Sequence, residues 1–140
     1  MNTKVIIAAI VGSVASFLLG WLVYGTLLMD FFKAHTIVYD GLMIEPPRLW
    51  AIFLSGLAWS FMLAYVFDKW ANTRSFGQGL TNGMIIMFPI VLGMDLSFCA
   101  FMNLYDTTLL CTDIVVSTIF YGVIAGIIAM TLGSGKKAAA

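Results

Sequence analysis

Four long apolar runs, separated by polar stretches, dominate the pattern of hydrophobic and polar positions along the chain. They lie at about residues 5–29, 49–67, 80–102 and 109–132. Each is close to the ~20 residues that an α-helix needs to cross a hydrocarbon layer about 30 Å thick. The pattern predicts four transmembrane helices in one domain, residues 1–137, folded as an all-α four-helix bundle.

The connections between the runs indicate which helices are neighbours. The first connection, residues 30–48, is long and ends in a proline pair, which prevents helix there and starts the second helix at Arg48 or Leu49. The third connection is only a turn, around residues 104–107. We therefore expect the last two helices to form a tight antiparallel hairpin, beside a hairpin of the first two.

Composition supports a membrane protein and excludes other classes. The 140 residues are 61% hydrophobic and 10% charged, with a mean hydropathy of +1.00. Soluble domains are about 45–50% apolar and about 25% charged. The net charge is zero and no basic stripe is present, so nucleic-acid binding is not expected and the lipid bilayer is the first partner. The first run is too long for a signal peptide and is interpreted as a retained helix.

Basic residues are distributed unequally between the two sides that this topology defines. Cytoplasmic segments are enriched in Lys and Arg, which places both termini in the cytoplasm of a multi-pass protein in a bacterial inner membrane. Trp21 and Tyr24 fit the aromatic belt at the opposite interface. Residues 138–140 are interpreted as a linker remnant. The terminal side carries Lys4, Lys69, Arg74, Lys136 and Lys137, and the other side carries Lys33 and Arg48.

The third run carries two residues that a simple membrane anchor would not have. Pro89 removes one backbone hydrogen bond and predicts a helix kink that frees the carbonyl of Ile85. Asp95 places a carboxyl group within the hydrocarbon layer, which costs roughly 2.5–3.5 kcal/mol on insertion scales when charged. Such a residue normally faces protein or water rather than lipid.

A second carboxyl group lies at a comparable depth. Asp95 precedes the turn by about 15 Å of helix and Asp113 follows it by about 10 Å, at 1.5 Å per residue. Ser117 lies one turn below Asp113 on the same helix face. The sequence therefore predicts an intramembrane polar centre near the outer side. Its candidate members are Asp95, Asp113, Ser97, Asn103, Thr112 and Ser117.

Three interpretations of this centre remain open. Asp113 can be a helix residue near an N-terminus, favoured by the helix dipole, with Asp95 buried and protonated. Alternatively, the two carboxyl groups bind a proton or a cation. In the third interpretation, Asp95 contacts a partner subunit or a ligand.

Small residues recur every four positions in three of the runs. Such spacing lets transmembrane helices approach closely. The simpler interpretation is packing inside the bundle, and the alternative is that one ridge, such as Gly122 and Gly126, forms a homo-oligomer. The ridges contain Gly12, Ser16 and Gly20; Gly79 and Gly83; and Gly122 and Gly126.

The two cysteines fall at similar levels on the expected hairpin. Cys99 lies six residues before Tyr105, and Cys111 lies five after Asp106. A disulfide near the outer face is geometrically feasible, and two free cysteines that simply pack are the alternative.

No metal site, cofactor site or active site is indicated. The single histidine, His35, lies in the first connection and is interpreted as a solvated loop residue, although the surrounding residues 31–39 can instead lie along the membrane interface. Metal-ligand spacings, a Ser-His-Asp set, a phosphate loop and paired haem histidines are all missing from the sequence. We expect no metal, no cofactor and no enzymatic activity.

Residues 19–25, LGWLVYG, followed by Phe31-Phe32-Lys33, resemble the bacterial membrane family called domain of unknown function 1761. The third run, with its glycines and Asn103, adds to this resemblance, although residues 23–26 read Val-Tyr-Gly-Thr where the family usually has Trp-Tyr-Ser-Pro. The resemblance covers most of the chain and implies four spans in a membrane. It implies no activity.

Two functions follow from these observations. The first is an accessory or structural subunit that assembles with itself or with a larger membrane complex. The second is a small homo-oligomeric channel or transporter for protons, cations or a small solute, with Asp95 and Asp113 at its polar centre. The first is favoured, because no continuous polar stripe runs from one face of the membrane to the other.

Overall fold

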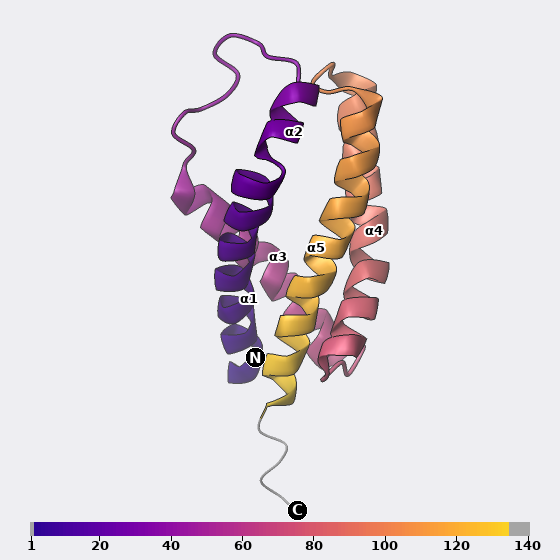
Figure 1. Ribbon diagram of the computed structural model, residues 1–140. Coiled ribbons are helices and arrows are strands. Elements are labelled where there is room, and N and C mark those ends of the chain that lie inside the picture. Colours follow the sequence, from indigo (N-terminus) through magenta and orange to yellow (C-terminus); the bar gives the residue numbers. More distant parts are fainter. Residues whose placement is uncertain (1, 135–140) are drawn as a thin grey trace, which may run out of the picture.

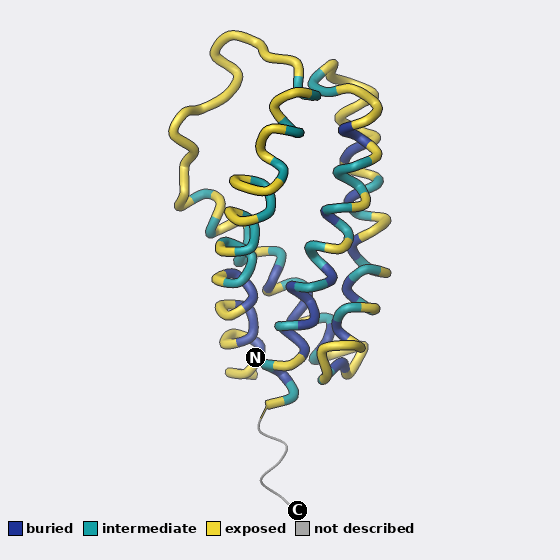
Figure 2. The backbone as a smooth tube through the Cα atoms, in the orientation of Figure 1, coloured by how far each residue is buried: buried dark blue, intermediate teal, exposed yellow. Residues whose placement is uncertain are grey.

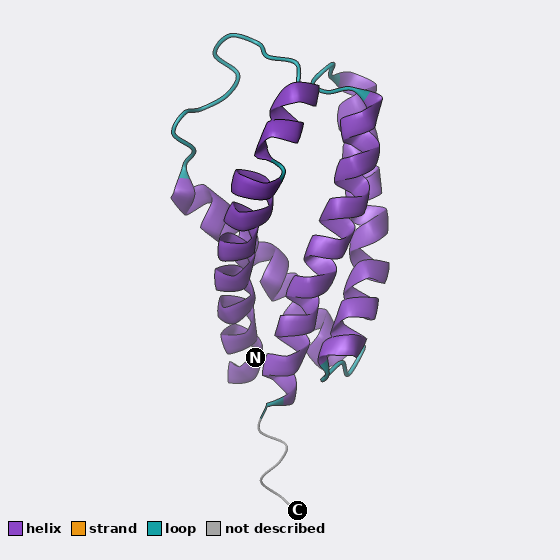
Figure 3. Cartoon of the chain, viewed as in Figure 1, coloured by secondary structure: helices purple, strands orange, loops and turns teal. Residues whose placement is uncertain are grey.

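The computed structural model describes residues 2–134 and shows an all-helical fold (Figure 3). Four of its helical segments, Thr3–Leu27, Leu49–Lys69, Phe76–Phe101 and Thr107–Gly133, are long and apolar enough to cross a membrane. Lys136, Lys137 and the expected linker remnant lie outside the described residues. The elements in chain order are α1 (Thr3–Leu22), the π-helical segment η1 (Val23–Leu27), α2 (Met29–His35), α3 (Leu49–Lys69), α4 (Phe76–Phe101) and α5 (Thr107–Gly133).

The first helix is not the uninterrupted helix expected over residues 5–29. It changes to π-helical geometry at Val23, breaks at Leu28 and restarts as the seven-residue α2. Charges explain why α2 forms in a segment interpreted as loop: Asp30 lies in its first turn, and Lys33 and His35 lie in its last turn. Both placements are favourable to the helix dipole.

The helices pair as two hairpins placed side by side (Figure 1). The first hairpin joins α1 to α3, and the second joins α4 to α5. Helix α5 also packs against α1 and α3, and so connects the two hairpins. In Figure 1, α3 runs obliquely behind α1 and α5, and the start of α1 and the end of α5 lie at the same end of the bundle.

Glycines bring the backbones of α4 and α5 into direct contact. A Cβ atom added at Gly79 would lie 2.6 Å from the carbonyl oxygen of Ala125 and 2.8 Å from the Cα atom of Gly126. A Cβ atom at Gly122 would lie 2.5 Å from the side chain of Met84 on α4. The ridge of Gly122 and Gly126 is therefore used inside the bundle, which overturns the interpretation of this ridge as a homo-oligomer contact.

The remaining small residues pack α1 against its neighbours. A Cβ atom at Gly12 would lie within 2.8 Å of Ile128 on α5 and of Ser60 on α3. The hydroxyl group of Ser13 donates a hydrogen bond of 3.0 Å to the carbonyl oxygen of Phe53 on α3. Gly20 is looser, since its nearest neighbour, Phe120, would lie 3.7 Å away. Small side chains thus act here as intramolecular contacts, as expected for helices that associate by close approach.

The buried core lies in the half of the bundle that contains the two described chain ends (Figure 2). Apolar side chains of α1, α3 and α5 meet there, and this burial holds the oblique α3 in place. The opposite half is more open in the isolated chain. The largest core side chains are Leu63, Phe67, Met87, Ile124, Ile128, Leu132 and Val5.

Polar contacts stabilise the turn between α3 and α4. Arg74 pairs with Asp68 at 2.8 Å, and the side-chain amide of Asn82 donates a hydrogen bond of 2.9 Å to the hydroxyl oxygen of buried Thr73. Helix α4 then continues through Pro89 to Phe101, so the proline does not end the helix. The kink at Pro89 stays a prediction.

The α4–α5 contact gives a direct test of the packing. We expect Gly79→Ala to lower the free energy of unfolding by about 1–3 kcal/mol, because the new methyl group would collide with the backbone of α5. Thermal unfolding of the purified protein measures this loss.

Gly93→Ala is the matched control, because Gly93 is in the same helix and has no atom within 4 Å of an added Cβ. This variant should equal the wild type or exceed it by up to about 1 kcal/mol, the usual helix advantage of alanine. Equal stability of the two variants would contradict the proposed close contact.

Candidate functional site

Two carboxyl groups face one another between α4 and α5, in the half of the bundle away from the termini. Asp95 on α4 is 9% exposed, and Asp113 on α5 is half-buried. The two groups lie close enough to interact electrostatically. The Oδ2 atom of Asp95 is buried and has no hydrogen-bond partner among residues 2–134. The structure therefore brings the two predicted carboxyl groups together.

Ser117 extends this pair into a hydrogen-bonded chain. Its hydroxyl group donates a hydrogen bond of 3.2 Å to Oδ1 of Asp113, one helical turn earlier. The phenol oxygen of Tyr24 lies 2.8 Å from the same serine oxygen. Because the hydrogen of Ser117 is directed to Asp113, Tyr24 is the donor in this second hydrogen bond. The chain runs from Tyr24 through Ser117 to Asp113.

Tyr24 is the member of the site that the sequence reasoning missed. It was interpreted as an interfacial aromatic residue, but η1 directs it toward α5 instead. Its ring packs edge-on against Phe32 and Phe120, at centroid distances of 5.4 and 5.7 Å. π-Helical turns commonly occur at functional sites, where the extra residue re-aims a side chain. Hydropathy carries no signal for such a turn.

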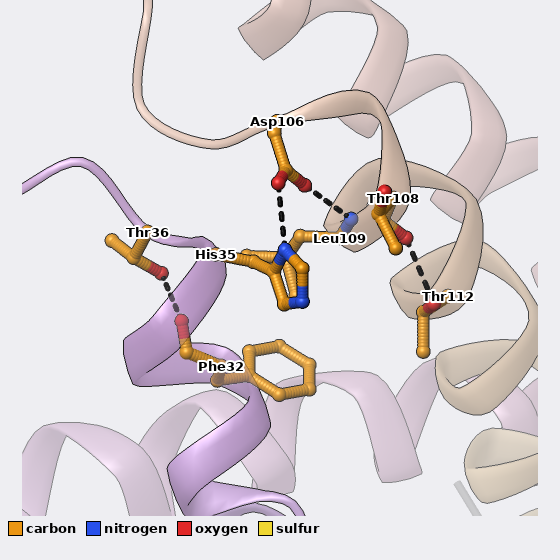
Figure 4. Close-up of polar contacts among 7 residues, drawn as sticks. All are labelled: Phe32, His35, Thr36, Asp106, Thr108, Leu109 and Thr112. Carbon is orange, nitrogen blue, oxygen red and sulfur yellow. Dashed lines mark hydrogen bonds and ion pairs between the residues drawn. The ribbon is translucent and has the colours of Figure 1, made fainter.

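Three of the predicted members lie outside this cluster. Ser97 is exposed and its hydroxyl group donates to the carbonyl oxygen of Gly93 on its own helix, at 2.7 Å. Asn103 is exposed and contributes only its backbone carbonyl group, to a contact described below. Thr112 likewise bonds within its own helix, to the carbonyl oxygen of Thr108 (Figure 4). The prediction was wrong for these residues, because depth along a helix does not fix the direction of a side chain.

Among the described residues, no basic side chain neutralises the two carboxyl groups. The ion pairs within residues 2–134 are Asp68–Arg74 and His35–Asp106, and neither includes Asp95 or Asp113. Two unpaired carboxylates are costly to hold together in apolar surroundings. A site of this kind is neutralised by a shared proton or by a bound cation.

A strap, residues 35–39, crosses the turn above the carboxyl pair. The strap N–H of Ile37 donates to the carbonyl oxygen of Leu104 at 2.7 Å, and Thr36 and Tyr105 form an isolated β-bridge. The phenol group of Tyr39 donates to the carbonyl oxygen of Asn103 at 2.6 Å. These contacts join the end of α2 to the α4–α5 turn, as the upper part of Figure 1 shows.

His35 anchors this strap, which corrects its interpretation as a solvated loop residue. Its Nδ1 atom lies 2.6 Å from Oδ2 of Asp106 (Figure 4). Because an ionised carboxylate only accepts hydrogen bonds, Nδ1 is the donor. The other carboxyl oxygen of Asp106 accepts a hydrogen bond of 2.8 Å from the N–H of Leu109 and so caps α5. The hydrogen bond from His35, followed by that from Leu109, lowers the pKa of Asp106 below its ordinary value.

Tyr105 connects the strap to the carboxyl pair beneath it. Its hydroxyl group donates to the carbonyl oxygen of Asp95 at 3.5 Å. Burial raises the pKa of the Tyr105 phenol, and the negative charges of Asp95 and Asp113 raise it further. Tyr105 is therefore a neutral hydrogen-bond donor at physiological pH.

Cys99 and Cys111 are both free and exposed, so the disulfide considered from the sequence is not formed. Within residues 2–134, no group of three or more His, Cys, Asp or Glu side chains is arranged to hold a metal ion. The chain matches no protein-family model, and no similar curated protein or solved structure was found. The interpretation of the site therefore depends on its own geometry.

The lowered pKa of Asp106 predicts how stability changes with pH. A carboxyl group whose folded-state pKa is depressed stabilises the fold above its ordinary pKa of about 3.9, and this stabilisation is lost as the pH falls through the folded-state pKa. We expect the wild type to melt above Asp106→Asn at about pH 6 and the difference to shrink toward about pH 3.

Asparagine retains the α5 cap through its single acceptor oxygen, so the comparison reports the charge of Asp106 together with its hydrogen bond from His35. Melting temperatures measured across this pH range in the two proteins supply the test. A difference that does not change with pH would mean that the His35–Asp106 contact contributes no charge-dependent stability.

Proposed function

We propose that the protein is a multi-pass membrane protein that holds a proton or a small cation at the Asp95–Asp113 pair. The observation that carries this proposal is the buried Oδ2 atom of Asp95, which has no partner within the described chain and lies beside a second carboxyl group. An intramembrane acid without a cationic partner is expensive to maintain and marks an ion or proton site. Buried acceptors in native structures normally have a partner.

Membrane insertion with both termini in the cytoplasm of a bacterial inner membrane is part of this proposal. Lys4 is in the first turn of α1, and Lys69 and Arg74 are at the α3–α4 turn. These elements lie at the end of the bundle where α1 begins and α5 ends, whereas the strap and the long first connection lie at the other end. The resemblance to domain of unknown function 1761 implies four spans in a bacterial membrane. In this orientation the carboxyl pair lies in the outer half of the membrane.

The topology predicts opposite labelling of two engineered cysteines. In a chain with Cys99 and Cys111 replaced by serine, Met43→Cys should react with a membrane-impermeant maleimide added to intact cells. Ala71→Cys, which is also exposed and non-helical, should react only after the membrane is permeabilised. The reverse pattern would invert the proposed orientation.

A wide aqueous pore through one chain is not supported. The half of the bundle that contains the termini is filled by apolar side chains such as Phe67, Ile124 and Ile128. A conducting pore needs polar lining or wet vestibules. The proposed site is therefore one of binding and proton exchange rather than of bulk ion flow.

An accessory subunit of a larger membrane complex, or of a homo-oligomer, is the second candidate. On α4, Gly93 and Ser97 are four residues apart, exposed, and Gly93 has open space around it. Exposed small residues at this spacing suit a partner helix. This pair replaces Gly122 and Gly126 as the surface on which assembly would depend.

The proposed site predicts a specific loss in Asp95→Asn. The wild type should release about one proton per chain from the carboxyl pair on alkaline titration, or exchange it for an added monovalent cation. Infrared difference spectra of the protonated carboxyl group, with its shift in heavy water, measure this release. Asp95→Asn should lose the signal without a lower melting temperature, because asparagine keeps the size of the side chain and its amide group can donate a hydrogen bond to Asp113 as a protonated carboxyl group would.

Ser97→Ala is the matched control, because Ser97 lies two residues from Asp95 but is exposed. It should titrate as the wild type does. The absence of carboxyl titration in the wild type would contradict the proposed site. Co-purification with a stoichiometric foreign subunit would then favour the accessory function.

A further inference from the structure

A groove of about 400 Å³ lies between α1, α3 and α5, beside the polar cluster. Tyr24 lines this groove and also makes the hydrogen bond to Ser117. The hydroxyl-bearing residues Ser16, Ser55 and Tyr121 line the same groove. The carboxyl pair is therefore connected, through Ser117 and then Tyr24, to a groove whose lining is mostly apolar but includes three further hydroxyl groups.

Small residues create the room for this groove. Gly20 and Gly56 both line it, and a Cβ atom at Gly56 would already touch the hydroxyl oxygen of Ser16 at 3.4 Å. A water molecule takes up about 30 Å³ and needs two to four polar partners. The groove has space for several water molecules, and its hydroxyl-bearing lining residues can supply such partners.

We propose that the species held at the carboxyl pair is a proton, and that Tyr24 and Ser117 relay it between water in the groove and Asp113. This inference rests on the proposed function, since it names the substrate of the same site and the route by which it arrives. The two hydrogen bonds of 2.8 and 3.2 Å form the whole relay.

The transfer moves one proton and changes no oxidation state. A hydronium ion in the groove gives a proton to the phenol oxygen of Tyr24, whose own hydrogen passes to Ser117. The hydroxyl hydrogen of Ser117 then passes to Oδ1 of Asp113. Each O–H bond that breaks is replaced by one that forms, so the two hydroxyl groups end neutral and the carboxylate ends protonated. Rotation of the hydroxyl groups resets the chain.

The arrangement favours a proton over a metal cation. Ca²⁺ and Mg²⁺ take about six or more oxygen ligands. Within residues 2–134, no group of three or more His, Cys, Asp or Glu side chains is arranged to hold a metal ion. The oxygen atoms of Tyr24 and Ser117 are also joined by hydrogens directed toward Asp113. A hydroxyl chain of this kind transmits protons and leaves no space for an ion to follow. The strap covers the turn above the pair, so the groove is the lateral access.

Tyr24→Phe tests the relay. Phenylalanine keeps the edge-on packing with Phe32 and Phe120 and removes only the hydroxyl group. After a pH jump on protein in liposomes, the rate at which the carboxyl band responds should fall on the order of 10²-fold, which is the usual scale of a lost proton-transfer group. The amplitude of the band at equilibrium should stay unchanged. Ser117→Ala should give the same slowing.

Tyr65→Phe is the matched control, because Tyr65 is an exposed tyrosine on α3 that is not among the residues lining the groove. Its rate should equal that of the wild type. If the carboxyl band of both Tyr24→Phe and Ser117→Ala responds at the wild-type rate and with the wild-type amplitude, the relay is wrong, although the carboxyl site itself still stands. A band amplitude that depends on sodium or potassium concentration at fixed pH would overturn the assignment of the proton. No band in the wild type would instead refute the proposed function.

Discussion

The close approach of α4 and α5 determines the geometry of everything around it. Gly79 lets the backbone of α4 reach the carbonyl group of Ala125, and this contact fixes the distance and the rotation of the two helices. Asp95 and Asp113 lie further along the same pair of helices, near the turn that joins them. Their mutual position therefore depends on glycines that carry no chemistry of their own. Between transmembrane helices, which lack a hydrophobic driving force for association, close packing of this kind is a main determinant of their relative position.

The sequence predicted the depth of the polar residues well, because helix rise is fixed. Counting from the turn placed Asp95 and Asp113 at comparable depths, and the structure brings them together. Rotation was harder to predict. Ser97 is only two residues from Asp95, but at 3.6 residues per turn it points to roughly the opposite side of α4 and is exposed. Ser117, four residues from Asp113, stays on the same face and bonds to it.

Two other features were beyond sequence reasoning for different reasons. The π-helical turn that aims Tyr24 at Ser117 leaves no mark in hydropathy, since Val23–Leu27 lies within one long and mostly apolar run. The His35–Asp106 contact joins two connections that only the tertiary fold brings together. The sequence did contain a hint of this contact. His35 and Asp106 both belong to connections on the same side of the predicted topology, where a histidine and a carboxylate can meet. Their pairing also explains why the segment after α2 is ordered against the α4–α5 turn.

The strap has a consequence for the order of assembly. His35 and Asp106 are separated by 71 positions, and the chain between them contains the whole of α3 and α4. Their hydrogen bond closes this length of chain into a loop, which is entropically costly until the enclosed helices are packed. We therefore expect the contact to form late, after the two hairpins have packed and brought Asp106 next to His35. Its presence then marks a bundle in which the strap already covers the turn above the carboxyl pair.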